Sequence, residues 1–235
     1  ASAGSSYSMD NFMKPVIGKR PVIAFDLPGN GESDNPMGTT VTVEAQAKYL
    51  AQAIKAAGYT EVDLFGYWGG CTVAVELAVQ HPDLVKHVAA PTLMVLPDVV
   101  RDEYLARYTP TIELEDYGVH WLKVWNMVRD QELFSPWYMR KKDHIVRDHE
   151  PDIEPTVIHR RTVDLFKALD IYQSAYGACF RYPVLEKLPQ VACPILLSDA
   201  AGDTRQALTA SKATTDKALP HDPAALASEL LSFFG

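Results

Sequence analysis

The chain has few cysteines and no long apolar run. Its 235 residues contain only Cys71, Cys179 and Cys193, which are scattered through apolar stretches. This pattern is typical of reduced core thiols and argues against a disulfide framework or a zinc site. No apolar run approaches the roughly 18 residues that a membrane span needs. We therefore expect a cytoplasmic protein with no bound metal and no membrane association.

Basic residues are scarce relative to acidic ones. Lys and Arg number 22 against 30 Asp and Glu, which gives a formal net charge of -8. An acidic surface repels phosphate backbones, so we expect no nucleic-acid partner. The sequence also lacks internal repeats and low-complexity tracts, and its 47% hydrophobic content is enough for a packed core.

Strand and helix signals alternate in the first third of the chain. Apolar runs at residues 21–26, 61–65 and 85–96 predict strands, and apolar residues at helical spacing predict a helix over residues 42–57. A further helix should follow residue 70 and end before His81. Such alternation predicts a mostly parallel, doubly wound α/β sheet, with active-site residues at the carboxyl ends of the strands.

The middle of the chain has a different pattern. Residues 97–185 contain no good strand signal, and residues 158–176 show the spacing of one long amphipathic helix. Strand signals return at residues 194–197, and residues 222–234 predict a last helix with Asp222 as its N-cap. We therefore predict three segments: core residues 1–96, an all-helical cap or lid of residues 97–185, and core residues 186–235.

Two motifs carry a resemblance to a known family. Residues 26–33 read Asp-Leu-Pro-Gly-Asn-Gly-Glu-Ser, and residues 64–70 read Leu-Phe-Gly-Tyr-Trp-Gly-Gly before a helix. Both resemble loops of the α/β-hydrolase fold family, the second being its nucleophile elbow, and the helical middle resembles the cap of some members. The resemblance implies a cofactor-independent hydrolase that acts on a small molecule.

The elbow departs from the family pattern at its central residue. Gly66 and Gly70 supply the two small positions of Gly-x-nucleophile-x-Gly, which places Trp68 where Ser, Cys or Asp should stand. Indole cannot form an acyl-enzyme, and Cys71 lies one position beyond the motif. Trp68 is either the floor of a lid-covered pocket, with Tyr67 beside it, or a substitution that silenced the site.

The resemblance also implies an acid and a base. The family places an acid after the strand at residues 194–197, where Asp203 and Asp199 compete, and a histidine after the last strand, near His221. Asp98 is a further candidate acid. His221 has a simpler interpretation as a surface residue beside the cap of the last helix, and both interpretations stay open.

The beginning of the chain resembles the tail of the family's oxyanion loop. On that basis Ser2 and Gly69 would supply the oxyanion N–H groups. The three strands that precede this loop in the family are absent, and the third normally lies between the strands at residues 21–26 and 61–65. Because central parallel strands need partners on both edges, we expect about 25–50 further N-terminal residues, enough for three typical strands.

The helical middle adds its own candidates. His120 could act as an acid or base, although a histidine among apolar residues more often makes a structural hydrogen bond, and Arg129 could contact substrate. Eight aromatic residues gather in residues 104–138, and they form either lid packing or the wall of a site for a flat or apolar molecule. They are Tyr104, Tyr108, Tyr117, Trp121, Trp125, Phe134, Trp137 and Tyr138.

Three functions remain open at this stage. The chain could hydrolyse an ester, a lactone or a C–C bond, or act as a lyase or isomerase, by direct water activation or proton transfer from His221 or His120. It could instead bind a small ligand or a protein without catalysis, or be an active enzyme whose nucleophile was replaced by Trp68. The expected partner is a small-molecule substrate, and a homodimer is left open.

Overall fold

Four parallel strands form the sheet in the computed structural model, which describes residues 3–147, 149–198, 214–216, 218–220 and 222–235. Their order across the sheet is β1-β2-β3-β4, with β1 at Val62–Phe65, β2 at Val85–Ala90, β3 at Ile195–Leu197 and β4 at Thr214–Asp216. The register pairs Leu64 with Val88, and Val88 with Ile195. The predicted parallel α/β sheet is confirmed.

Helices account for most of the remaining elements. The α-helices are α1 (Asp10–Met13), α2 (Val43–Ala56), α3 (Gly69–Gln80), α4 (Asp98–Arg107), α5 (Val119–Leu133), α6 (Pro155–Lys167), α7 (Tyr172–Arg181), α8 (Val184–Lys187) and α10 (Pro223–Phe234). Short 3-10 helices lie at η1 (Ser6–Met9), η2 (Lys142–His144) and η3 (Leu188–Gln190).

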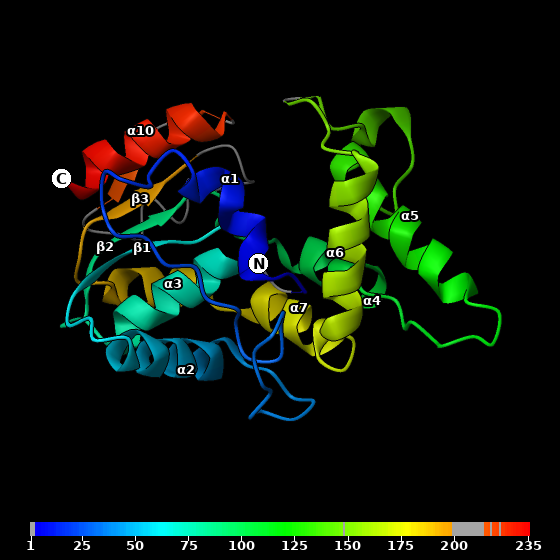
Figure 1. Cartoon of the computed structure of the whole chain (residues 1–235), viewed down its shortest axis with the longest axis horizontal. Helices are drawn as coiled ribbons and strands as arrows, with labels where there is room; N and C mark the ends of the chain where they lie inside the picture. Colours follow the sequence, from blue (N-terminus) through cyan, green and yellow to red (C-terminus); the bar gives the residue numbers. More distant parts are fainter. Residues whose placement is uncertain (1–2, 148, 199–213, 217, 221) are drawn as a thin grey trace.

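Both faces of the sheet are covered by helices (Figure 1). Helices α2 and α3 pack below the sheet in that view, where their apolar residues form the main core with β1, β2 and β3. Helices α10 and α1 lie on the opposite face, where Leu226 and Leu230 pack with Ala89 and Leu196. Asp222 caps α10, because its carboxylate accepts the Ala225 N–H at 2.8 Å, as the sequence predicts.

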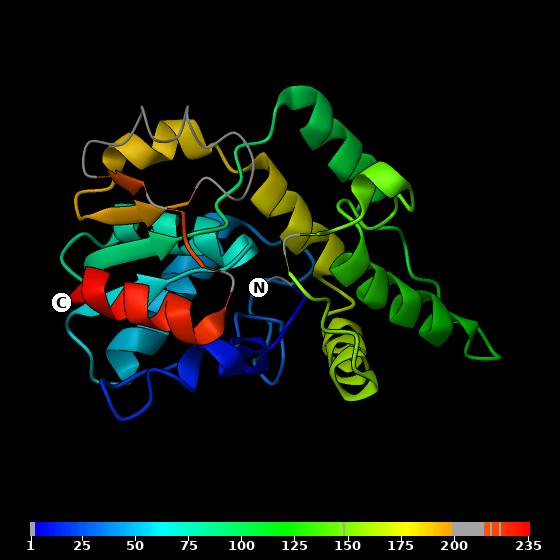
Figure 2. The same ribbon diagram turned by 90° about the horizontal axis from the view of Figure 1, so that it is seen from above.

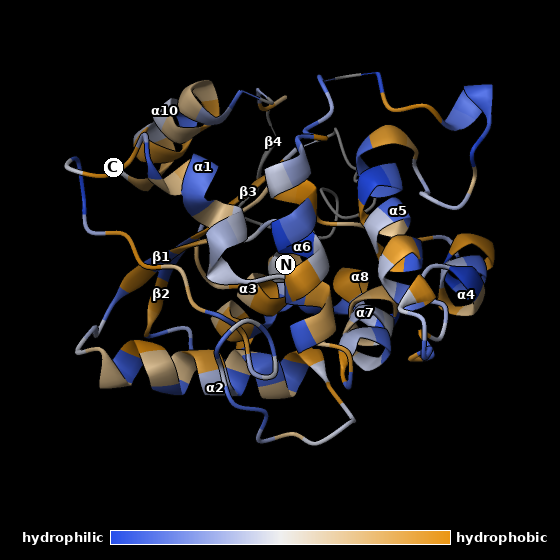
Figure 3. Cartoon of the chain, turned by 45° about the vertical axis from the view of Figure 1, so that its right-hand side comes forward, coloured by the Kyte–Doolittle hydropathy of each residue, from blue (hydrophilic) through white to orange (hydrophobic). Residues whose placement is uncertain are grey.

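The chain between β2 and β3 is helical, in agreement with the expected pattern. Helices α4 to α7 lie beside the sheet rather than on its faces (Figures 1 and 2). Helix α6 alternates hydrophobic and hydrophilic residues (Figure 3), and its apolar side packs Ile158 and Leu165 against Val124 and Val128 of α5.

Two expected elements differ in extent. The single helix expected over residues 158–176 is two helices, since the chain turns at residues 168–171 between α6 and α7. Ile158 and Leu165 pack with α5, whereas Ile171 and Ala175 pack in a separate cluster with Val41. Two different packing partners explain the break. The strand expected over residues 85–96 ends at Ala90.

The strand expected at residues 21–26 is wrong. These residues are not assigned to a strand, and all of them are at least partly exposed. A strand needs a neighbour for its backbone hydrogen bonds, and among the described residues β1 pairs only with β2. The apolar composition of the segment was correctly recognised, but no described strand pairs with it.

Two negative findings concern the described residues. No helix among them is long and apolar enough to cross a membrane. Within the same part of the chain, no three His, Cys, Asp or Glu side chains gather in a way that could hold a metal ion.

Candidate active site

A strained backbone turn joins β1 to α3. Trp68 has φ 48° and ψ −123° and is the residue immediately before α3. Only Ala3 among the other described non-glycine residues has a positive φ. A positive φ in a bulky residue costs about 1–3 kcal/mol and persists only where the surroundings enforce it. The strand-to-helix turn predicted around Trp68 is therefore present.

The two glycines that flank this turn are not equivalent. A Cβ added to Gly66 would lie 2.5 Å from the Gly70 carbonyl oxygen and 2.7 Å from the Cys71 Cα, so the backbone allows no side chain there. A Cβ on Gly70 would meet nothing within 4 Å. Close backbone packing thus explains the glycine at position 66, whereas position 70 has room for a larger residue.

Thr92, which follows the neighbouring strand β2, holds the turn. Its Oγ1 accepts a hydrogen bond from the Trp68 backbone N–H and lies 3.3 Å from the Cys71 sulfur. Thr92 is buried and follows β2 by two residues. Sequence reasoning missed it, because nothing in the sequence marks a threonine after one strand as the partner of a turn after another.

Cys71 is a buried thiol rather than a nucleophile. Its side chain is fully buried, and burial raises the pKa of the thiol to about 12, although a hydrogen bond with Thr92 opposes the shift. The reactive form of cysteine is the thiolate, which is negligible near neutral pH at such a pKa.

The Trp68 indole is more exposed than a covered pocket floor would be. It is 47% exposed, which corrects the expectation of a floor under a lid. The residue projects from the tip of a sharp turn, where an edge-on contact with Tyr67 at 6.0 Å is its one described ring contact. Tyr67 packs toward α1, where its ring lies 5.0 Å from that of Phe12.

His120 accepts a hydrogen bond from a residue just ahead of its own helix. It is buried at the start of α5, and its Nδ1 accepts a hydrogen bond from the Glu115 backbone N–H at 2.9 Å. An imidazole nitrogen that accepts a hydrogen bond carries no proton, so a neutral His120 has its proton on Nε2. That tautomer offers a proton at Nε2 rather than a lone pair for a base.

Arg129 and Trp121 also make local contacts. The Arg129 Nη2 lies 2.9 Å from Asp130 Oδ1, and Arg140 binds the other oxygen of that buried carboxylate at 2.5 Å. Trp121 stacks on Phe166 with ring centroids 4.2 Å apart. The Trp121–Phe166 stacking joins α5 to α6, which is the packing interpretation left open above for the aromatic residues, whereas the Arg129–Asp130 contact lies within α5.

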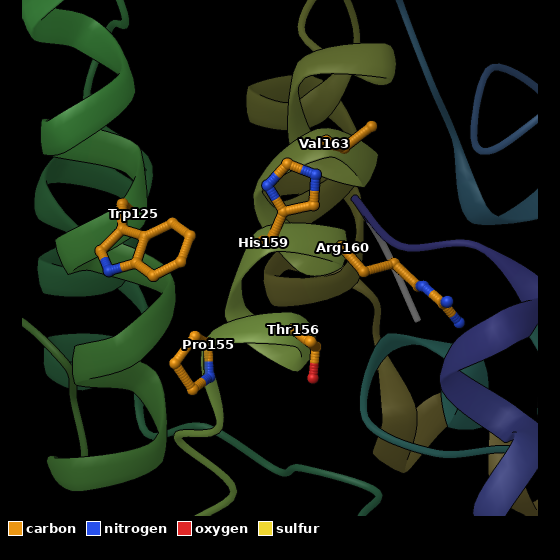
Figure 4. Close-up of a pocket in the computed structure, with 6 residues that line it drawn as sticks. All are labelled: Trp125, Pro155, Thr156, His159, Arg160 and Val163. Carbon is orange, nitrogen blue, oxygen red and sulfur yellow. The ribbon is translucent and has the colours of Figure 1, made fainter.

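Trp125 lines a cavity between α5 and α6. The cavity has a volume of about 620 Å³. Figure 4 shows the Trp125 indole and the His159 imidazole facing the same space, while Arg160 extends away from it. Arg160 instead stacks its guanidinium over the Tyr7 ring. The lining residues are Trp125, Pro155, Thr156, His159, Arg160 and Val163.

Several expected site residues cannot be placed. His221, Asp203, Asp199 and Ser2 lie outside the described residues. Asp98 is at the start of α4, where its carboxylate makes an exposed ion pair with Arg101 at 2.7 Å. Gly69 is the first residue of α3, so its N–H stands at the helix terminus that follows the turn.

Comparison with known proteins agrees with this geometry. A family model described as the alpha/beta hydrolase fold matches residues 2–108, which include the turn at Trp68. The chain has the alpha/beta hydrolase fold. The fold also matches a hydrolase from Pseudomonas aeruginosa with a TM-score of 0.72 and 16% identity, over 100% of this chain and 87% of that one.

Two further proteins that are similar to this chain have named activities. An enol-lactonase from Burkholderia xenovorans matches with a TM-score of 0.70 and 17% identity, over 100% of this chain and 88% of that one. A pimeloyl-[acyl-carrier protein] methyl ester esterase from Neisseria meningitidis is 36% identical over 80 residues. That match covers 34% of this chain and 29% of the esterase, so less than a third of the esterase is represented.

We predict opposite effects for alanine at the two glycines. Gly66→Ala should destabilise the fold by about 2 kcal/mol or more, because the new Cβ meets backbone that cannot move aside. Gly70→Ala should be neutral or stabilising by up to about 1 kcal/mol, because it replaces glycine in the first turn of a helix. Urea denaturation measures both. Equal losses in the two variants would contradict this asymmetry.

A second prediction concerns the hydroxyl of Thr92. Thr92→Val keeps the shape of the side chain but leaves the Trp68 N–H without an acceptor, which should lower the free energy of unfolding by about 1–3 kcal/mol. Thr92→Ser retains the hydroxyl and is the matched control. If Thr92→Ser costs more than Thr92→Val in urea denaturation, the methyl contact rather than the hydrogen bond holds the turn.

Proposed function

We propose that this alpha/beta hydrolase acts on a small, largely apolar or aromatic molecule by direct water activation, without a covalent intermediate. The observation that carries the proposal is the strained turn at Trp68. It keeps the backbone shape that an elbow nucleophile requires, and Thr92 holds it in place although no nucleophilic side chain is present. The strained backbone at Trp68 costs free energy. The simplest reason for the protein to keep it is that the site still uses this conformation.

Without a nucleophilic side chain, the turn can still contribute to catalysis through its backbone N–H groups. The turn places the Gly69 N–H at the start of α3, where an amide at a helix N-terminus stabilises negative charge. We assign Gly69, with Ser2, to stabilise the oxyanion that forms when water adds to a carbonyl. His221 is assigned as the base that activates the water and Asp203 as its acid partner. His120 remains the alternative acid–base residue, as a proton donor at Nε2.

The substrate class follows from the side chains near the turn and between the helices. Trp68 offers an exposed indole face and one N–H donor, and Tyr67 stands beside it. We assign helices α4 to α7 as a cap that contributes Trp121, Trp125 and Arg129 to substrate binding. The named activities of the enol-lactonase and the methyl ester esterase support ester or lactone hydrolysis.

A catalytically silent protein is the second candidate. The observation that favours it is Trp68 itself, since indole offers neither oxygen nor sulfur for attack, and its half-exposed ring provides a surface for a ligand or a protein. The two candidates differ in whether a working acid–base pair faces the turn, so the experiment has to detect that pair directly.

We predict that a nucleophile can be restored at the turn. The native chain should form no covalent adduct with a fluorophosphonate probe, because Trp68 cannot react. The variant W68S should gain one adduct per chain, because its hydroxyl stands on an elbow backbone beside an intact base. Intact mass spectrometry measures the adduct, and circular dichroism checks folding.

The matched controls separate the two candidates. W68A has the same loss of bulk without a hydroxyl and should stay unlabelled, and W68S combined with His221→Ala should lose reactivity. A folded W68S that never reacts would favour the silent candidate. An adduct on the native chain, at Cys71 or Ser33, would overturn the non-covalent mechanism.

We also predict that His221→Ala lowers hydrolysis of small aryl esters and lactones by about 10²–10⁴-fold, the usual contribution of a general base. Its melting temperature should change by only a few degrees, which distinguishes lost chemistry from lost folding. His120→Ala is the matched comparison. If it abolishes turnover while His221→Ala has no effect, the catalytic acid–base residue lies among the helices between β2 and β3.

A further inference from the structure

The start of helix α5 exposes apolar side chains. Tyr117 is 96% exposed and Leu122 is 65% exposed, and Leu114 and Val119 are exposed as well. Single apolar residues on a surface are common, but a group of them within a short segment is typical of an interaction site. We call Leu114, Tyr117, Val119 and Leu122 the α5 patch.

Local contacts hold the α5 patch in a defined shape. The Glu115 N–H donates to the buried His120 Nδ1 at 2.9 Å, and the Glu115 carboxylate pairs with Lys123. These two contacts fold residues 115–118 back onto the first turns of α5. The start of α5 projects on the side of the molecule away from the C-terminus (Figures 1 and 2). A partner that docks here would meet a preorganised surface, which lowers the cost of binding.

Acidic residues flank the α5 patch. Residues 113–116 contain Glu113, Glu115 and Asp116 and no basic residue, and Glu113 and Asp116 are exposed. Negative charge repels an anionic lipid surface and nucleic acid. The patch therefore fits a partner surface that combines apolar side chains with positive charge.

The surface at the other end of α5 has this combination. Residues 140–147, which we call the basic segment, are fixed there, because Arg140 binds the buried Asp130 carboxylate at 2.5 Å and the Val146 N–H donates to the Leu133 carbonyl at 3.0 Å. Ile145 of this segment is an exposed apolar residue. The segment also carries four exposed basic side chains against one acidic side chain. The basic ones are Arg140, Lys141, Lys142 and Arg147.

The outer face of α5 is complementary to itself when two copies run antiparallel. Val119, Leu122, Asn126 and Leu133 recur at i, i+3, i+7 and i+14, so they lie on one side of the helix. With Asn126 on a two-fold axis, Val119 of each copy would lie opposite Leu133 of the other, because both residues are equally far from Asn126 along the helix. The same register brings residues 113–116 of each copy beside the start of the other copy's basic segment. Arg129 shares this spacing, and its guanidinium binds Asp130 in its own chain.

We propose that two copies of this chain associate through α5, with the two helices antiparallel and related by a two-fold axis. Such an interface uses the same surface on both subunits, so every contact occurs twice. The α5 patch of each copy packs on the end of the other α5, and its acidic flank lies beside the other basic segment. The antiparallel helix dipoles add to the attraction. The inference does not depend on the proposed chemistry.

Sedimentation velocity tests the association. Over about 1–200 µM, a range suited to a weak interface, the weight-average mass of the native chain should rise from that of one chain toward that of two. Leu122→Lys should raise the dissociation constant at least about 30-fold, because it places a charge inside an apolar contact. Val99→Lys changes an exposed apolar residue of α4 and is the matched control that should leave the constant unchanged. Circular dichroism checks that both variants fold.

Charge reversal tests the antiparallel arrangement. Asp116→Lys and Lys142→Glu each bring like charges together and should each raise the dissociation constant about 10-fold. An equimolar mixture of the two variants should associate about as tightly as the native chain, because the mixed pair has opposite charges in contact at both ends. Such a rescue requires that the partner be a second copy of this chain.

Three results would overturn the proposal. The first is a native chain that stays monomeric over the whole concentration range, and the second is a dimer that Leu122→Lys leaves intact. The third is association that the two charge variants weaken and their mixture does not restore. If the monomer instead binds phosphatidylcholine vesicles and Leu122→Lys abolishes that binding, a lipid surface occupies the patch in place of a second copy.

Discussion

The hydrogen-bonding groups along the backbone of strand β1 shape both the sheet and the candidate site. One edge of the strand is paired with β2, the other borders an apolar groove, and its carboxyl end turns sharply at Trp68 into α3. Buried N–H and C=O groups must be paired, because an unpaired one costs about 1–3 kcal/mol. That requirement explains why residues 21–25 fail to form a strand, and it links the fold to the site, because the same strand carries both.

The site itself depends on backbone geometry more than on side-chain chemistry. Gly66 is needed because the Gly70 carbonyl lies where its Cβ would be, and Thr92 fixes the Trp68 N–H from the adjacent strand. These contacts hold a turn that an exposed tryptophan would not adopt on its own. The result is an elbow without a nucleophile, and any catalysis at this turn must rely on its backbone amide and on groups beyond it.

Local patterns in the sequence were sufficient for the elements that depend on local chemistry. Thr42 caps α2 through the Ala45 N–H, and Asp222 caps α10 through the Ala225 N–H, because a short polar side chain before a helix satisfies its first amides wherever the helix packs. Helical periodicity gave a wrong prediction where the packing partners change along the segment. Residues 158–176 have continuous helical spacing, yet Ile158 and Ile171 belong to different clusters, so the helix breaks between them.

Apolar spacing, glycine positions and helix caps were enough to predict the parallel α/β class, the helical character of residues 97–185 and the turn at Trp68. The three-dimensional structure was needed to show that Thr92 holds that turn and that Trp121 stacks on Phe166. It also shows that residues 21–25 are no strand. Each of these depends on a contact between residues distant in the sequence. The spacing of residues along the chain does not predict which distant residues come into contact.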